Sequence, residues 1–121
     1  IDEDKLVLMH CVSAYPCPEE NINFSKLKKL KKFSKKIGYS GHYKGVEDAI
    51  IAIAMGATFI EKHFTIDQEL PGRDNKNAIL PRHFKKIAEF RDLFSKMIID
   101  RGFEVQEIEK DIYQNYRGRW G

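Results

Sequence analysis

The sequence predicts an α/β fold in which parallel strands alternate with helices. Strand-like and helix-like segments follow one another three times between residues 5 and 100. The first of them, residues 5–12, is apolar almost throughout, which is typical of a parallel strand buried on both faces. Each connection from a helix back to the next strand is short, as in consecutive βα units. With 121 residues and 42% hydrophobic content, the chain can form one modest core but not a complete (β/α)₈ barrel of about 250 residues.

The first strand is followed by a loop and then by a helix. Pro16 and Pro18 exclude both a helix and a central strand directly after the strand. A helix is predicted over residues 23–36, with Asn23 as its N-cap, because apolar residues recur there at three-residue steps. These apolar residues are Phe24, Leu27, Leu30 and Phe33.

Lysines fill the other positions of this predicted helix and indicate a solvated outer surface. They are Lys26, Lys28, Lys29, Lys31, Lys32, Lys35 and Lys36. Nucleic-acid binding is the alternative, but the exposed side carries no interleaved aromatic residues. The formal net charge of +3, from 21 Lys and Arg against 18 Asp and Glu, also indicates neither a nucleic acid nor a membrane as partner.

The second βα unit follows directly. Residues 37–40 form the predicted strand, and Gly41 and Gly45 enclose the loop after it. Residues 46–55, with small and branched apolar side chains on most sides, predict a helix pressed against the sheet. Gly56 then supplies its C-terminal end.

The third unit carries ionisable residues on an apolar strand. Residues 58–64 are rich in β-forming side chains, yet Glu61 and His63 lie on the same face of this predicted strand. The polar loop of residues 65–81 is long enough to suggest a functional role. An amphipathic helix is predicted over residues 82–100.

Because sites in α/β folds gather at the carboxyl ends of the strands, we expect a cluster of polar residues there, with a histidine from each strand. It comprises His10, Ser13, Tyr15, Ser40, His42, Glu61 and His63. Imidazoles with a carboxylate suit Mn, Fe, Zn or Mg. From the residues alone, His10 is better explained as a buried structural histidine, and His42 is equally compatible with a ligand or an ordinary exposed histidine.

Two acidic residues have structural alternatives. Glu61 can be a ligand, a base or an ion-pair partner of Lys62 or of a neighbouring strand, and the residues alone slightly favour the ion pair. Asp74, beside Arg73 in a glycine-containing loop, can equally form an Asx-turn.

Cysteine usage and hydropathy predict a cytoplasmic protein. Cys11 and Cys17 provide neither a disulfide framework nor a four-cysteine zinc site, so we interpret them as one buried and one incidental thiol. The longest apolar run, residues 49–55, is far below the roughly 20 residues of a membrane span. The acidic start lacks the features of a signal peptide.

Four blocks of the sequence, in this order, resemble the sialic acid synthases: LMHCVSAYPCPEENIN, IGYSGH, GATFIEKHFT and LPGRD. This family comprises the N-acetylneuraminate, legionaminate and pseudaminate synthases, and the resemblance covers roughly residues 5–95. It implies a cytoplasmic bacterial transferase of polysaccharide biosynthesis. Such an enzyme condenses phosphoenolpyruvate with an N-acetylated hexose to give a nonulosonic acid, in a metal-assisted C–C bond formation.

The resemblance also implies a domain organisation. Residues 1–100 correspond to three consecutive βα units, strands six to eight, of a (β/α)₈ TIM barrel, present here as a partial barrel. Residues 101–121 are expected to be a tail or linker, and the antifreeze-like domain of the family to be absent. We expect a homodimer for the parent protein and no activity for this 121-residue chain alone.

The catalytic residues implied by the resemblance are His42, His63 and Glu61. The two histidines match the ligands of a divalent metal, Mn²⁺ first, with Mg²⁺ or Co²⁺ as alternatives. Glu61 matches a glutamate that supports the metal or acts as acid or base. Gly41 replaces the aspartate that usually precedes the first ligand, which we expect either to weaken the orientation of His42 or to mark a subfamily with a different metal affinity.

The resemblance implies four substrate-binding residues. Ser40 matches a serine that contacts phosphoenolpyruvate, and Asp74 matches an aspartate that binds the sugar hydroxyls. Ser13 and Tyr15 correspond to positions that line the sugar site. Some members carry asparagine instead of Ser13, so the sequence leaves the identity of the sugar open.

Two alternatives remain for the function. The first is another phosphoenolpyruvate-condensing barrel, of the 3-deoxy-octulosonate type. The second is a non-catalytic barrel fragment that binds a sugar or a protein partner, which the missing barrel units and Gly41 would explain.

Overall fold

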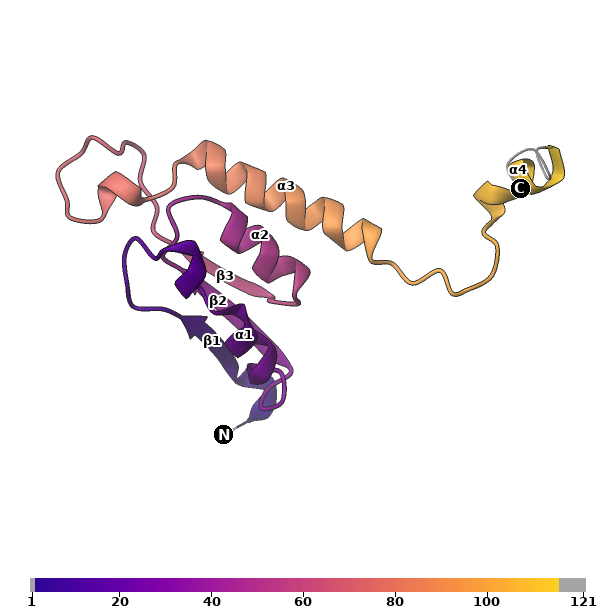
Figure 1. The fold of residues 1–121 in the computed structure, drawn as a ribbon, viewed down its shortest axis with the longest axis horizontal. Coiled ribbons are helices and arrows are strands. Elements are labelled where there is room, and N and C mark those ends of the chain that lie inside the picture. The colour runs from indigo at the N-terminus through magenta and orange to yellow at the C-terminus, as the bar shows by residue number, and fades with distance from the viewer. Residues whose placement is uncertain (1, 116–121) are drawn as a thin grey trace.

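The structure, a computed structural model, describes residues 2–115 and contains a three-stranded parallel sheet (Figure 1). Its strands are β1 (Val7–Cys11), β2 (Lys36–Gly41) and β3 (Phe59–Lys62), in the order β1-β2-β3. The α/β fold with parallel strands predicted from the sequence is therefore confirmed.

Helices α1 (Phe24–Leu30) and α2 (Glu47–Ala54) connect the strands and, with α3 (Pro81–Met97), lie on one face of the sheet. A fourth helix, α4 (Lys110–Asn115), lies away from the sheet. Short 3₁₀ segments lie at Glu3–Lys5, Glu19–Asn21, Asn75–Asn77 and Glu107–Glu109. The first helix contacts β1 and β2, the second contacts β2 and β3, and α3 packs on α2.

The core lies between these helices and the sheet. Leu27 of α1 is fully buried against Ile37 and Tyr39 of β2. A second cluster joins Ala49 of α2 to Ile87 of α3. Burying apolar side chains of this kind contributes about 1.5–3 kcal/mol each, so these two clusters hold the three βα units together.

The other face of the sheet has no helix over it among the described residues. Met9, Gly38 and Phe59 are register partners across the three strands, and the side chains of Met9 and Phe59 are 40% and 47% exposed. A parallel sheet is normally covered on both faces. This face is therefore left open by the described residues.

The first helix is shorter than predicted. It ends at Leu30, and Phe33, which was assigned to its apolar stripe, is 74% exposed. Ser34 explains the early end, because its hydroxyl donates to the carbonyl of Leu6 (3.1 Å) and so draws the chain to the start of β1. Asn23 precedes the helix as predicted, but in a left-handed conformation (φ 58°) and without a side-chain capping bond.

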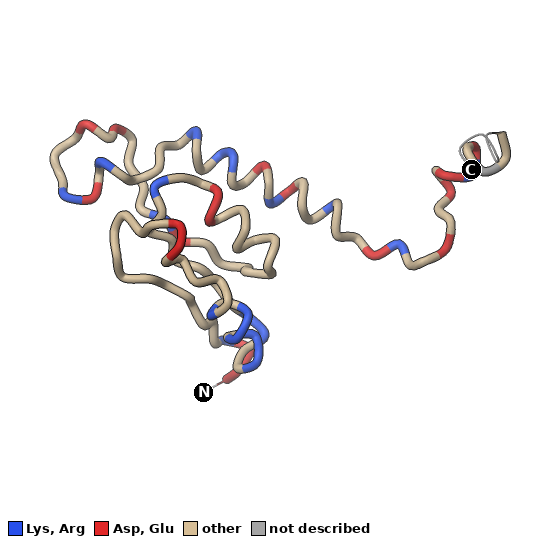
Figure 2. The backbone as a smooth tube through the Cα atoms, viewed as in Figure 1, with Lys and Arg blue, Asp and Glu red and all other residues tan. Residues whose placement is uncertain are grey.

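The lysines around α1 are exposed, as predicted for a solvated outer surface. Figure 2 shows them gathered near the N-terminal end of the chain. This confirms the solvated surface, and the charge lies away from the polar residues described below.

The third strand also ends early, at Lys62 rather than residue 64. Beyond it, Ile79 donates its N–H to the carbonyl of His63 (2.9 Å) and accepts from the N–H of Thr65 (3.0 Å). The loop of residues 65–80 thus returns to the strand end from which it started. The chain then enters α3, with Pro81 as its first residue.

The chain after α3 leads away from the sheet to α4 (Figure 1). Phe103, Val105 and Ile108 of this segment are exposed. The predicted tail therefore contains a short helix, and its residues 116–121 lie outside the described residues. Between residues 2 and 115, no helix is both long enough and apolar enough to cross a bilayer.

Candidate functional site

The carboxyl edge of the sheet brings together side chains from three different connections. His42 directly follows β2, His63 directly follows β3, and Tyr15 comes from the loop after β1. Asp74 reaches the same place from the loop of residues 65–80. Parallel strands end at one edge, which is why residues far apart in the sequence meet there.

The two imidazoles lie side by side. Their ring centroids are 5.1 Å apart, with the ring planes at 78°. The Nδ1 of His42 is 2.6 Å from the carbonyl oxygen of Val12, and the Nδ1 of His63 is 3.6 Å from a carboxylate oxygen of Asp74. The short contact with Val12 favours the Nδ1–H tautomer of His42 and leaves its Nε2 lone pair for a ligand, whereas the 3.6 Å contact of His63 is too long for a hydrogen bond.

Tyr15 packs against both histidines. Its ring stacks on that of His63 (4.3 Å between centroids, 21°) and meets the His42 ring edge-on (5.5 Å, 83°). Its hydroxyl donates to the backbone carbonyl of Asp74 (3.2 Å). Burial, and secondly the nearby charge of Asp74, raise the pKa of Tyr15, so the phenol stays neutral around neutral pH.

Asp74 is oriented toward the histidines rather than into a local turn. It stands before the 3₁₀ segment Asn75–Asn77, but its side chain makes no capping bond there. Its side chain is 55% exposed and lies beside His63. This arrangement leaves the carboxylate accessible to a ligand.

Ser40 and Glu61 form a second polar pair on neighbouring strands. They are register partners, and the Ser40 hydroxyl donates to Oε1 of Glu61 (2.7 Å). The ion pair between Glu61 and Lys62 considered from the sequence is wrong, because successive residues of a strand face opposite sides. Lys62 points to the helices and pairs with Asp48.

One residue predicted for the cluster lies apart from it. His10 is on the helix-covered face, 1% exposed, with Nε2 2.6 Å from the carbonyl oxygen of Ile22. His10 is therefore a structural histidine, which confirms the interpretation favoured by the residues alone. The expectation that each of the three strands brings a histidine to this edge is wrong. Ser13 is exposed, with no side-chain hydrogen bond to another described residue.

Both thiols are free. Cys17 is buried in the core, and Cys11 is half-buried. The sulfur of Cys11 lies 3.8 Å from Nδ1 of His42 and so borders the imidazole pair.

The sequence analysis missed a buried ion pair behind this edge. Lys62 donates to both carboxylate oxygens of Asp48 (3.1 and 3.0 Å) and to the carbonyl of Tyr43 (2.7 Å). The side chains of Lys62 and Asp48 are 2% and 0% exposed. Two features of the sequence could have indicated this pair. Lys62 follows Glu61 and so faces the opposite side of the strand, and Asp48 is a charged residue in the first turn of an apolar helix.

The environment shifts the pKa values of this network. Burial lowers the pKa of Lys62, and the charge and hydrogen bonds of Asp48 partly oppose that effect. Tyr39 donates its hydroxyl to Asp48 (2.8 Å), and burial followed by this bond raises the pKa of Tyr39 far above its usual range.

Gly41 has a structural explanation in the same network. A Cβ at this position would lie 2.7 Å from Cε2 of Tyr39 and 2.9 Å from Cδ of Lys62, and closer still to a carboxylate oxygen of Asp48. The space is thus occupied by the buried pair. The expectation that Gly41 weakens the orientation of His42 finds no support, since the Val12 carbonyl holds that ring.

The donor set fits a divalent metal that keeps open coordination positions. His42 and His63 offer two Nε2 atoms, and the described residues contain no group of three or more His, Cys, Asp or Glu side chains arranged to hold an ion. Two imidazoles with several remaining positions suit a metal that also binds water and substrate oxygens. A closed structural site would need four protein ligands.

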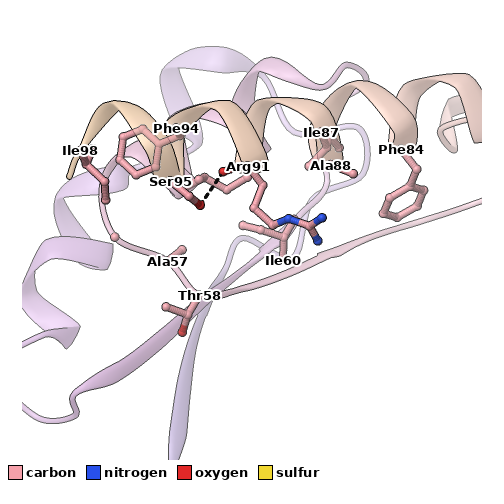
Figure 3. A pocket seen from close by; sticks show the side chains of 12 residues that line it. Ala57, Thr58, Ile60, Phe84, Ile87, Ala88, Arg91, Phe94, Ser95 and Ile98 are labelled. Atoms are coloured by element: carbon pink, nitrogen blue, oxygen red, sulfur yellow. Dashed lines mark hydrogen bonds between the residues drawn. The ribbon is translucent and has the colours of Figure 1, made fainter. Parts of the chain in front are cut away.

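A separate apolar cavity of about 520 Å³ lies between α2, β3 and α3 (Figure 3). Its lining includes Ile60, Phe84, Ile87 and Phe94, with the side chain of Arg91 reaching into it. None of the histidines or carboxylates described above lines this cavity. It is a packing groove beside the edge strand β3, distinct from the polar cluster.

Comparison with known proteins places this geometry in context. Residues 1–99 match the NeuB family. An uncharacterized protein of Methanocaldococcus jannaschii is 38% identical over 94 residues, covering 77% of this chain and 28% of that protein. The N,N'-diacetyllegionaminic acid synthase of Campylobacter jejuni is 37% identical over 83 residues, covering 68% of this chain and 25% of the enzyme.

A solved structure supports the same relationship. The N-acetylneuraminic acid synthetase of Leptospira borgpetersenii, in complex with citrate, superposes with a TM-score of 0.76 at 35% sequence identity. The superposition covers 95% of this chain and 41% of that one. The chain thus spans about a quarter of the length of the curated relatives it matches.

Proposed function

This chain belongs to the NeuB family, and from that membership together with the histidine pair we propose that it forms part of a nonulosonic acid synthase. The reaction is the condensation of phosphoenolpyruvate with an N-acetylated hexose. The observation that carries the proposal is the placement of His42 and His63, whose rings lie 5.1 Å apart, with Nδ1 of His42 bonded to the Val12 carbonyl and His63 beside the Asp74 carboxylate.

In this proposal the three βα units are strands six to eight of a (β/α)₈ barrel. The exposed sheet face of Met9 and Phe59 supports the assignment, because in a barrel that face lines the interior. The remaining units, and with them the complete active site, belong to the whole enzyme, which we propose is cytoplasmic and a homodimer.

His42 and His63 are the proposed ligands of a divalent metal, with Mn²⁺ the first choice. When bound, such an ion supplies Lewis-acid polarisation of the sugar carbonyl. The hydrogen bond to Val12 holds the ring of His42, and the ring of His63 is stacked on Tyr15 beside the carboxylate of Asp74. Fixing the tautomer in this way raises the affinity of an imidazole for its ligand.

Glu61 is the proposed acid or base. Ser40 occupies its Oε1 by hydrogen bonding, which leaves Oε2 to accept or return a proton. The same serine is the proposed contact of a phosphoenolpyruvate oxygen, which would couple substrate binding to the orientation of the carboxylate through one hydroxyl.

Tyr15 and Asp74 are the proposed sugar-binding residues, with Ser13 at the outer margin. Tyr15 offers an apolar ring and a neutral hydroxyl, and Asp74 offers a carboxylate acceptor that is 55% exposed. A hydroxyl-rich sugar needs such acceptors at the mouth of a site, close to the reacting carbonyl.

The proposal is tested by titration calorimetry of Mn²⁺ on the full-length protein that carries this chain. We expect wild type to bind the ion, and His42→Ala and His63→Ala to lose binding and phosphoenolpyruvate consumption with N-acetylated hexoses. His83→Gln is the matched control. His83 caps α3 by accepting the N–H of Leu80 (2.9 Å), a role that glutamine can fill, and it lies outside the polar cluster.

Unchanged binding in both alanine variants would leave the pair as structural histidines and end the catalytic assignment. Turnover with arabinose phosphate instead of an N-acetylated sugar would assign the chain to a 3-deoxy-octulosonate-type enzyme. Either result contradicts the proposed synthase.

A further inference from the structure

We propose that Lys62 is a positioning residue, which sets the spacing of the two metal-binding histidines from the opposite face of the sheet. The inference rests on the proposed function. Its basis is a single ammonium group that links the segments carrying His42 and His63, although it touches neither ring.

The first observation is the place of Lys62 in the strand. It directly precedes His63, and because side chains alternate along a strand, it points to the helices while His63 points to the candidate site. Lys62 and Gly41 are also the last register pair of β2 and β3. Beyond this pair, the backbone ladder no longer fixes the distance between the two strand ends.

The second observation is the contact that Lys62 makes beyond the ladder. Its Nζ donates to the backbone carbonyl of Tyr43 at 2.7 Å, and Tyr43 directly follows His42. Lys62, which precedes His63, is therefore bonded to Tyr43, which follows His42. This bond links the two strand ends where the sheet itself no longer does.

The third observation is that the bond is rigidly supported. Asp48, in the first turn of α2, accepts two hydrogen bonds from the ammonium and one from Tyr39. The paired side chains of Lys62 and Asp48 are almost fully buried. Since a charged group without such partners is costly to bury, the ammonium has little freedom to release Tyr43.

His42 is also held from the other side. Its carbonyl accepts the N–H of Cys17 (2.8 Å), and Val12 holds its Nδ1. These contacts link His42 to the loop after β1, whereas Lys62 links Tyr43 to β3. Loss of the Lys62 bond should therefore let the two histidines move relative to one another, and displacements of about 1 Å are enough to impair a site.

The test separates positioning from folding by removing the whole charged network. The variant Tyr39→Phe/Asp48→Leu/Lys62→Met leaves no buried charge and no unpaired hydroxyl, and buried ion pairs often tolerate apolar replacement. A milder variant, Asp48→Asn/Lys62→Met, keeps an acceptor for Tyr39. Tyr39→Phe alone is the control, because it removes one hydrogen bond and leaves the bond from Lys62 to Tyr43.

We expect calorimetry on the full-length protein to show a Kd for Mn²⁺ about 10–100-fold higher in each Lys62 variant, the range found when groups that orient metal ligands are removed. The Tyr39→Phe control should stay within about twofold of wild type. Near-UV circular dichroism and thermal unfolding show which variants are folded.

A folded Lys62 variant with wild-type Mn²⁺ affinity would overturn the positioning role and leave the proposed synthase intact. Unfolding of both Lys62 variants would assign the residue to the fold alone and would also contradict the proposal. Absence of Mn²⁺ binding in wild type would instead overturn the metal site itself, and with it both proposals.

Discussion

At the scale of single residues, Gly41 is a position where the space for a side chain is already filled. We expect Gly41→Ala to lower the free energy of unfolding by about 1–3 kcal/mol, the usual cost of overpacking, because its Cβ would press on Tyr39, Asp48 and Lys62. Urea unfolding of wild type and variant measures the difference. Lys44→Ala, at an exposed position nearby, is the control; an equal loss in both variants would contradict the explanation.

Tyr39 makes stability depend on alkaline pH. Its pKa is raised in the folded protein, whereas in the unfolded chain it ionises near its ordinary value of 10.0. The stabilisation is therefore complete below pH 10 and is lost as the pH rises above that value, because the unfolded state then releases a proton that the folded state keeps. We expect the free energy of unfolding to fall less steeply above pH 10 in Tyr39→Phe than in wild type.

The comparison is made by urea unfolding between pH 8 and 11. Burial lowers the pKa of Lys62 from its ordinary 10.5. This shift makes the free energy of unfolding rise with pH below 10.5, opposite to the effect of Tyr39. It is present in both wild type and Tyr39→Phe. Tyr43→Phe is the comparison: its hydrogen bond to Glu19 also raises the pKa of Tyr43, but this bond is exposed to solvent, so we expect a smaller change in the pH profile. Parallel pH profiles for wild type and Tyr39→Phe would contradict the assignment.

The sequence predicts the residues of the histidine pair but not the ion pair behind them. His42 and His63 each follow a recognisable strand and match the family blocks, so their common edge follows from the order of the elements. The role of Lys62 depends on Asp48, a residue of a different element. Its burial is a consequence of tertiary packing, which local patterns do not encode.

At the scale of elements, α1 shows where a periodic pattern overestimates a helix. The three-residue spacing from Phe24 to Phe33 continues past the true end at Leu30. The hydrogen bond from Ser34 to Leu6 decides the end instead, and it joins residues 28 positions apart. The same limitation applies to β3, whose last predicted residues are engaged by Ile79 of the returning loop.

The difference in burial between Leu27 and Phe33 can be measured as a difference in stability. We expect Leu27→Ala to lower the free energy of unfolding by about 2–5 kcal/mol, since Leu27 is fully buried in the core. Phe33→Ala should change it by less than about 0.5 kcal/mol, as is usual for exposed positions. Denaturant unfolding of both variants provides the comparison, and a similar loss at both positions would mean that Phe33 packs in the core.

At the scale of the whole molecule, the chain consists of a packed sheet with its helices and an extended C-terminal segment. The alternation of strands and helices was sufficient to predict the parallel sheet, because each segment showed the hydrophobic pattern of either a strand or a helix. The sequence after α3 shows neither pattern. Its short helix α4 was therefore not predictable from the pattern.

The exposed segment should be the first site of proteolytic cleavage. Residues 99–106 are exposed and lie outside the regular helices, and such segments are preferred by proteases. We expect brief trypsin treatment of the purified chain to cut after Arg101 before it cuts at the exposed lysines of α1. Mass spectrometry of the first fragments measures the order, and initial cleavage within α1 would show that the tail is protected.

The alternation of Glu61, Lys62 and His63 has a consequence for sequence change by insertion or deletion. Adding or removing one residue within β3 would turn the ammonium outward and the carboxylate and imidazole toward the helices. Such a change would disrupt both the candidate site and the packing against the helices. A substitution at Glu61 or His63 affects mainly the site, and one at Lys62 mainly the packing. Length variation among descendants of this chain should therefore accumulate in the loop of residues 65–80, and β3 itself should diverge by substitution only.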